Sequence, residues 1–362
     1  MRLEIERRPG VGPWLRVASP LIAVGVTVLL GAILFASLGK SPTDGLYTYF
    51  VEPLTDPWSL HEIAVKAAPL ILIGAGLCVC FRSGNWNIGA EGQFTLGAIT
   101  AASLPVLVPA ASGPWVLPAM AMLGLLGGAA WAAIPAVLRN RFAANEILVS
   151  LMLVYVAGFL LDWLVRGPWR NPEGFNFPET RSFDPSAILP ELISTGAWGG
   201  RANWGFVIAV LVSVAVWWLV SRTLKGYELT VTGHSARAAR FGGFDAKRTT
   251  LFAFVVSGAL AGLAGMIEVS GAIGQLRPQI SPGYGFIAII VAFLARLNPL
   301  GAILAGLALA VTHIGGEAAQ LSLGISERIA RVFQGLLLFS VLATDTLVTH
   351  RIRVRRTAPV AA

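Results

Sequence analysis

Long apolar segments recur along the chain and constrain its fold more than any other feature. A helix needs about 20 apolar residues to cross the ~30 Å hydrocarbon core of a bilayer. Charged residues make up only 13% of the chain, about half of what soluble domains carry, so a water-soluble globule would expose large apolar patches. We therefore expect an all-α polytopic membrane protein with about ten transmembrane helices, at about residues 17–38, 62–81, 89–108, 115–138, 146–165, 204–221, 249–270, 285–295, 299–316 and 328–346.

Basic residues are distributed unevenly between the loops on the two sides of the predicted membrane. With the N-terminus inside, the inner segments hold 18 of the 27 lysines and arginines. The positive-inside rule favours this orientation, in which both termini are cytoplasmic. The longest inner segment is then 222–248 and the longest outer loop is 166–203. Lipid headgroups would balance the net charge of +8, and nucleic acid is not an expected partner.

Two segments rich in glycine and polar residues interrupt the apolar blocks, at residues 87–94 and 281–286. Five predicted spans precede the loop 166–203 and five follow it, so the second half would enter the membrane from the opposite side. Inverted repeats with broken helices are a transporter architecture. We therefore expect one transmembrane domain over residues 1–362, with inverted five-helix halves at about 17–166 and 204–346.

Common catalytic and metal-binding patterns are missing from the sequence. The four histidines lie in four different segments, and Cys78 and Cys80 are two positions apart in an apolar run. Residues 34–41 match a phosphate-binding loop only in part, because Leu34 stands where that loop needs glycine. We therefore expect no catalytic residue, no metal site, no cofactor and no ATP hydrolysis by this chain.

Ionisable residues within spans are costly in lipid and often functional; here they are Glu91, Glu146, Asp162, Glu268, His313 and Glu317. Most lie near a predicted span end, where an interfacial or capping role suffices. Glu91 differs, because it lies in the first break near Asn85, Asn87 and Gln93. These side chains either satisfy the irregular backbone or line a hydrated pathway for a hydroxyl-rich solute. Trp86, between two asparagines, is a further pathway candidate.

Several motifs together resemble those of bacterial ABC-importer permeases for nucleosides and simple sugars. They lie at residues 81–93, 145–147, 167–172, 257–262 and 282–286. The resemblance covers about residues 15–346 and is strongest to the longer of the two permeases that pair in nucleoside importers served by basic-membrane-lipoprotein-type binding proteins. The wider superfamily includes ribose and branched-chain amino-acid permeases.

The resemblance implies a fold of the vitamin-B12-importer-like (type II) kind and a site in the bacterial inner membrane. The resemblance also implies a cytoplasmic coupling helix that contacts an ATPase, with Gly233, His234, Ala238, Ala239, Arg240, Phe241 and Gly242. The residues of the two breaks themselves predict the solute pathway, formed by Asn85, Trp86, Asn87, Glu91, Gln93, Tyr284 and Phe286. Val154 departs from the family, whose members often have asparagine there.

The function implied is that of a permease subunit of an ATP-driven importer, which moves nucleosides or related simple sugars into the cytoplasm. Its partners would be ABC ATPase subunits that bind Mg-ATP, a second and homologous permease chain, an extracytoplasmic solute-binding lipoprotein and membrane lipid. Two alternatives stay open. One is an ABC permease for branched-chain amino acids, and the other is an ion-coupled secondary transporter in which Glu91 or Glu268 carries the proton.

Overall fold

The computed structural model describes residues 2–7, 13–193, 200–326 and 328–355. The chain divides into two compact units. The terminal unit consists of residues 1–52 and 315–362, and the central unit consists of residues 53–314. Each is described separately below.

In the terminal unit, α1 (Pro13–Ser37) packs along α14 (Arg328–Thr349), and α2 (Pro42–Phe50) packs against α1. A buried aromatic cluster holds these helices together. The rings of Tyr49 and Phe333 stack with their centroids 4.4 Å apart, and Phe35 lies 5.5 Å from Phe333. Aromatic rings bury much area per residue, so a few of them suffice to join short helices.

A short antiparallel sheet departs from the all-α expectation. Strand β1 (Arg2–Arg7) pairs with β2 (His350–Arg355). Both sequences alternate charged and apolar residues with a period of two, which favours a strand over a helix. The register sets Glu4 opposite Arg353 and Glu6 opposite Arg351. Neither strand is long or continuously apolar, so the apolar blocks of the sequence did not predict this sheet.

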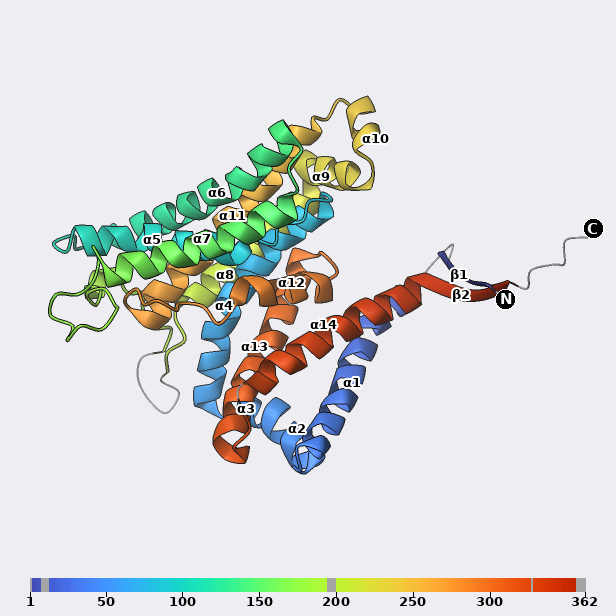
Figure 1. Cartoon of the computed structure of the whole chain (residues 1–362), viewed down its shortest axis with the longest axis horizontal. Coiled ribbons are helices and arrows are strands. Elements are labelled where there is room, and N and C mark those ends of the chain that lie inside the picture. Colours follow the sequence, from blue (N-terminus) through green and yellow to red (C-terminus); the bar gives the residue numbers. More distant parts are fainter. Residues whose placement is uncertain (1, 8–12, 194–199, 327, 356–362) are drawn as a thin grey trace, which may run out of the picture. The chain divides into compact units, whose positions relative to one another are not determined.

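The central unit contains most of the long apolar helices (Figure 1). Along the whole chain, each predicted apolar block coincides with one helix, except that the block 249–270 runs from α11 into η2. The elements of the central unit are α3 (Glu52–Thr55, which begins at the unit boundary), α4 (Pro57–Arg82), α5 (Ala90–Leu107), α6 (Val116–Phe142), α7 (Glu146–Arg166), η1 (Pro185–Ala187), α8 (Trp204–Arg222), α9 (Leu224–His234), α10 (Ala236–Phe241), α11 (Ala246–Ile267), η2 (Glu268–Ile273), α12 (Tyr284–Leu294) and most of α13 (Pro299–Leu323).

Six helices of the described chain are long and apolar enough to cross a membrane: α4, α6, α7, α8, α11 with η2, and α13. The six helices differ in the fraction of their apolar stretch that is buried inside the protein. In α4, 89% of the most apolar stretch is buried inside the protein, against 22% in α7. An apolar helix that buries little of itself in protein suits contact with lipid. The total number of spans and the inverted halves stay predictions.

Glycines bring α5, α6 and α11 into backbone contact, and Figure 1 shows these helices side by side. A methyl group on Gly128 would overlap the carbonyl oxygen of Gly258, and one on Gly262 would overlap that of Gly124. A methyl group on Gly97 would overlap the backbone of Gly262. Small residues at a helix interface permit this approach, and close packing is what associates helices in lipid.

We expect Gly262→Ala to destabilise the protein by about 1–3 kcal/mol, because the new methyl group meets backbone that cannot rotate away. A fall in the thermal unfolding midpoint in detergent would measure the effect. Gly158→Ala in α7 is the matched control, since nothing lies within 4 Å of the added methyl group. Equal midpoints for the two variants would contradict the packing argument.

Candidate functional site

The first break is the irregular segment between α4 and α5, residues 83–89, and a buried pair of amides stabilises it. Asn87 and Gln93 exchange two hydrogen bonds, each 2.9 Å long. Asn87 also donates to Ser257 Oγ at 3.0 Å and accepts from the Gly89 N–H at 3.1 Å. Both amide side chains are fully buried. Their hydrogen bonds therefore satisfy the irregular backbone and join it to α11.

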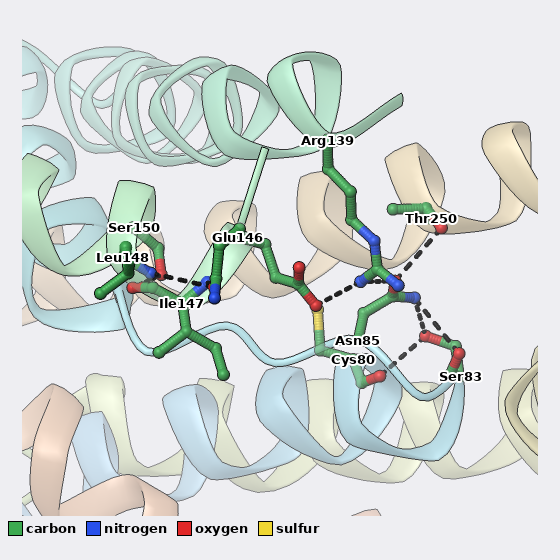
Figure 2. A network of polar contacts seen from close by, with 10 residues as sticks. Cys80, Ser83, Asn85, Arg139, Glu146, Ile147, Leu148, Ser150 and Thr250 are labelled. Carbon is green, nitrogen blue, oxygen red and sulfur yellow. Dashed lines mark hydrogen bonds and ion pairs between the residues drawn. The ribbon is translucent and has the colours of Figure 1, made fainter. Parts of the chain in front are cut away.

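A second polar network surrounds Asn85 at the start of this break (Figure 2). Arg139 at the end of α6 donates to Asn85 Oδ1 at 2.7 Å and pairs with the Glu146 carboxylate at the start of α7. Thr250 of α11 donates to the same Asn85 oxygen at 3.2 Å, and Asn85 Nδ2 donates to Ser83 Oγ at 2.6 Å. One buried asparagine thus links α6, α7 and α11 to the end of α4.

Glu91, expected in the first break, lies in the first turn of α5, and its carboxylate contacts the start of α12. The Gly285 N–H, in the first turn of α12, donates to Glu91 Oε2 at 2.6 Å. A side chain on Gly285 would overlap the backbone of Glu91, so this contact needs glycine. On the second break, Ser281 Oγ accepts from the N–H groups of Gly283 and Tyr284 at 3.0 and 2.9 Å. The Glu91 carboxylate thus satisfies one N–H at the start of α12, and Ser281 satisfies two more within the second break.

The seven predicted pathway residues lie around these breaks, but they differ in exposure. Asn85, Asn87, Gln93 and Tyr284 are buried, and the Tyr284 hydroxyl lies 3.5 Å from the Glu268 carboxylate. Trp86 and Phe286 are 43% and 41% exposed. The Trp86 ring lies 5.2 Å from the Phe81 ring and 6.0 Å from that of Phe293 in α12. Of the predicted pathway residues, the two aromatic ones are thus well exposed, while the amides support the backbone.

The predicted coupling segment folds as two short helices, α9 and α10, which Figure 1 shows at one end of α11. Ser235 separates them and caps α10, because its hydroxyl accepts from the Ala238 N–H at 3.2 Å. Of the residues assigned to coupling, Ala239 is fully buried, whereas Phe241 is 86% exposed. The remaining ones (Gly233, His234, Ala238, Arg240 and Gly242) are exposed. Ala239 therefore packs within this chain, and the exposed side chains are available to a partner.

Helix α9 lies directly on the end of α4. A methyl group on Gly233 would overlap the carbonyl oxygen of Arg82, and the Arg82 Nε–H donates to Thr230 Oγ1 at 3.1 Å. The first break begins at the next residue, Ser83. The structure therefore brings the coupling segment and the first break into contact, which spacing in the sequence did not predict.

Glu228 fastens α9 to α11. Its carboxylate accepts from Thr249 Oγ1 at 2.6 Å and from Lys225 Nζ at 2.7 Å. Burial of Glu228 disfavours its charged form, but these two hydrogen bonds outweigh that effect and lower its pKa below the ordinary value. The carboxylate is therefore charged at neutral pH and holds the helix pair at a fixed place.

Several residues of the site were not among the predicted ones: Ser257, Gly285, Ser281, Arg139 and Thr250. Ser257, Ser281 and Gly285 lie within or beside the motifs that resemble those of ABC-importer permeases. Ser257 and Thr250 could have been found from the sequence, because each is a polar residue inside or at the end of an apolar helix. Within the described residues, no three histidine, cysteine or acidic side chains gather as a metal ion would require.

The paired amides yield a double-mutant prediction. Asn87→Leu leaves the Gln93 amide without its partner, and Gln93→Met removes two of the hydrogen bonds of Asn87, so each change should cost about 1–3 kcal/mol of unfolding free energy. The double variant removes both partners and should cost less than the sum. Unfolding in mixed detergent micelles measures all three. Additive costs would show that the two amides do not depend on each other.

Comparison with known proteins identifies the family to which this chain belongs. Residues 59–342 match the family model described as "Branched-chain amino acid transport system / permease component". A glucose ABC transporter permease protein of Haloferax volcanii is 34% identical, over 98% of this chain and 94% of its own length. A nucleoside ABC transporter permease protein of Lactococcus lactis is 28% identical, over 90% of each chain.

A guanosine ABC transporter permease protein of Bacillus subtilis is 26% identical, over 90% of this chain and 92% of its own length. Among solved structures, PsaBC from Streptococcus pneumoniae in complex with Fab aligns at 12% identity with a TM-score of 0.41, over 82% of this chain and 92% of that one. That structural likeness is too weak to assign a fold. The family match and the full-length relatives show that this chain belongs to the branched-chain amino acid transport system permease family.

Proposed function

We propose that this permease serves an ATP-driven importer and moves nucleosides, or related simple sugars, into the cytoplasm. Relatives with similarity over nearly their whole length are named for glucose, nucleosides and guanosine. A nucleoside and a simple sugar share a hydroxyl-rich ring. These names favour such solutes over branched-chain amino acids, although the family carries the latter name.

The single observation that carries the transport mechanism is the contact of Gly233 with the Arg82 carbonyl. It joins α9 and α10 to the residue before the first break. An ATPase that binds α10 differently in its ATP-bound and ATP-free states would displace α9. The end of α4 would then move with it, which biases the break between two arrangements.

The solute would pass beside Trp86 and Phe286, whose side chains are partly exposed; Phe286 lies in the first turn of α12, and Trp86 lies beside Phe293 in its last turn. Aromatic faces pack against the apolar faces of bases and sugar rings. Asn85, Asn87, Gln93, Glu91 and Tyr284 would take part mainly by holding the two breaks in shape, as their hydrogen bonds suggest.

The proposed setting is the inner membrane of a bacterial cell, in a type II fold with about ten spans in two inverted halves. Both termini and segment 222–248 would lie in the cytoplasm, where an ABC ATPase with Mg-ATP binds α10. A second, homologous permease chain would complete the pathway, and a solute-binding lipoprotein would dock on the outer side, near loop 166–203.

The substrate test is to co-express the chain with the products of its neighbouring genes, reconstitute the purified complex and screen solutes for stimulated ATP hydrolysis. We expect nucleosides or simple sugars to stimulate hydrolysis. If branched-chain amino acids alone stimulate hydrolysis, the proposed solute class is wrong. If a proton gradient drives uptake without any ATPase, the proposed ATP-driven mechanism is wrong.

A coupling test follows from the exposed ring of Phe241. Phe241→Glu should leave this chain folded, because the side chain is 86% exposed, while a carboxylate at a docking contact should reduce ATPase co-purification and coupled hydrolysis at least tenfold. Phe142→Glu, at the exposed end of α6, is the matched control. Ala239 is unsuitable as a target, because it is buried within the chain. Undiminished ATPase binding by Phe241→Glu would remove α10 from the interface.

A transport test addresses Glu91. Glu91→Gln keeps an oxygen that can accept from the Gly285 N–H, so import of a neutral solute should fall only a few-fold. Glu91→Leu leaves that buried N–H without an acceptor, at about 1–3 kcal/mol, and should abolish import or folding. If Glu91→Gln abolishes import while solute still stimulates the ATPase, the charge itself is required and the neutral pathway is wrong.

A further inference from the structure

A cavity of about 630 Å³ lies beside the contact between α9 and α4. Four parts of the central unit line this open cavity: the last turn of α4, the end of α8, helix α9 and the turn that joins α12 to α13. None of the residues assigned to the solute pathway lines it. It adjoins the coupling segment, whose Gly233 and His234 line it, and it is separate from the residues assigned to the solute pathway.

Two arginines and a histidine are among the residues that line the cavity, and no carboxylate is. Arg82, His234 and Arg296 contribute their side chains, together with the polar Ser221 and Asn298. Arg82 donates to Thr230 through Nε, which holds its guanidinium in the wall. Neither Arg82 nor His234 forms an ion pair with a carboxylate in the part of the chain described. Such a lining favours an anion.

The turn that carries Arg296 is held in an unusual conformation. Arg296 and Leu297 have φ angles of 53° and 56°, in the left-handed region that side chains other than glycine rarely adopt. Consecutive strained residues persist only where the surroundings enforce them, and they concentrate at functional sites. Here the strain accompanies the placement of an arginine in the cavity wall.

We propose that this cavity binds a phosphate group, carried either by the headgroup of an anionic phospholipid or by a free phosphate compound. Arginine guanidinium groups present several N–H donors that match phosphate oxygens. Trp217 and Phe81 form the apolar part of the wall, which suits the glycerol and upper acyl carbons of a lipid as well as a compact solute. A bound phosphate would bridge α9 to the α12–α13 turn.

The test uses the full chain, delipidated in a neutral detergent, and three probes: dioctanoyl phosphatidylglycerol, dioctanoyl phosphatidylcholine and inorganic phosphate. Dissociation constants come from titrations followed by intrinsic fluorescence and by thermal unfolding. We expect phosphatidylglycerol, inorganic phosphate or both to bind, and phosphatidylcholine to bind much more weakly. Binding of the lipid alone identifies a headgroup site, and binding of phosphate as well extends the site to free phosphate compounds.

Substitutions of residues that line the cavity test whether the probes bind there. Arg296→Gln and Arg82→Gln should each raise the dissociation constant about tenfold, the loss expected for one charge-assisted hydrogen bond. Two variants are used because a substitution in the strained turn can impair folding, whereas Arg82 lies in regular helix. Arg141→Gln is the control, since Arg141 is exposed at the end of α6 and does not line the cavity. No binding of either anionic probe, equal binding of phosphatidylcholine, or equal weakening by Arg141→Gln would overturn the proposal.

Discussion

The glycine contact between α6 and α11 is the constraint on which the rest of the central unit depends. Gly124 and Gly128 meet Gly258 and Gly262 through backbone atoms alone. In lipid there is no hydrophobic force between helices, so close packing must supply their attraction. The same contact fixes the position of Ser257, the residue before Gly258, which reaches Asn87 in the first break. Helix packing and break geometry are therefore set together.

Buried polar groups then hold the irregular backbone that the packed helices surround. Asn85 joins three helices to the end of α4, the Asn87–Gln93 pair closes the break itself, and Glu91 ties it to the second break. Each hydrogen bond to these groups matters more than it would near water, because an unpaired polar group inside a membrane is costly. The site is consequently a connected network rather than a set of independent residues.

Local patterns in the sequence predicted the helices and the breaks, because apolar length and glycine content act over short distances. The α10 helix after Ser235 was likewise visible as a short pattern. The partners of the break were not predictable in this way: Asn85 and Thr250 are 165 positions apart, and Asn87 and Ser257 are 170 apart. Tertiary packing alone decides such pairs. The burial of Ala239 and the pairing of β1 with β2 also depend on tertiary contacts, so local sequence patterns did not predict them.

The contact of Gly233 with the Arg82 carbonyl has a mechanical consequence. Where side chains separate two helices, a change of rotamer can accommodate a small movement of one helix without moving the backbone of the other. At Gly233 the main chain of α9 meets the main chain of Arg82 directly, and the Arg82 side chain holds Thr230 beside it. A displacement of α9 would therefore act on the backbone at the end of α4, one residue before the first break.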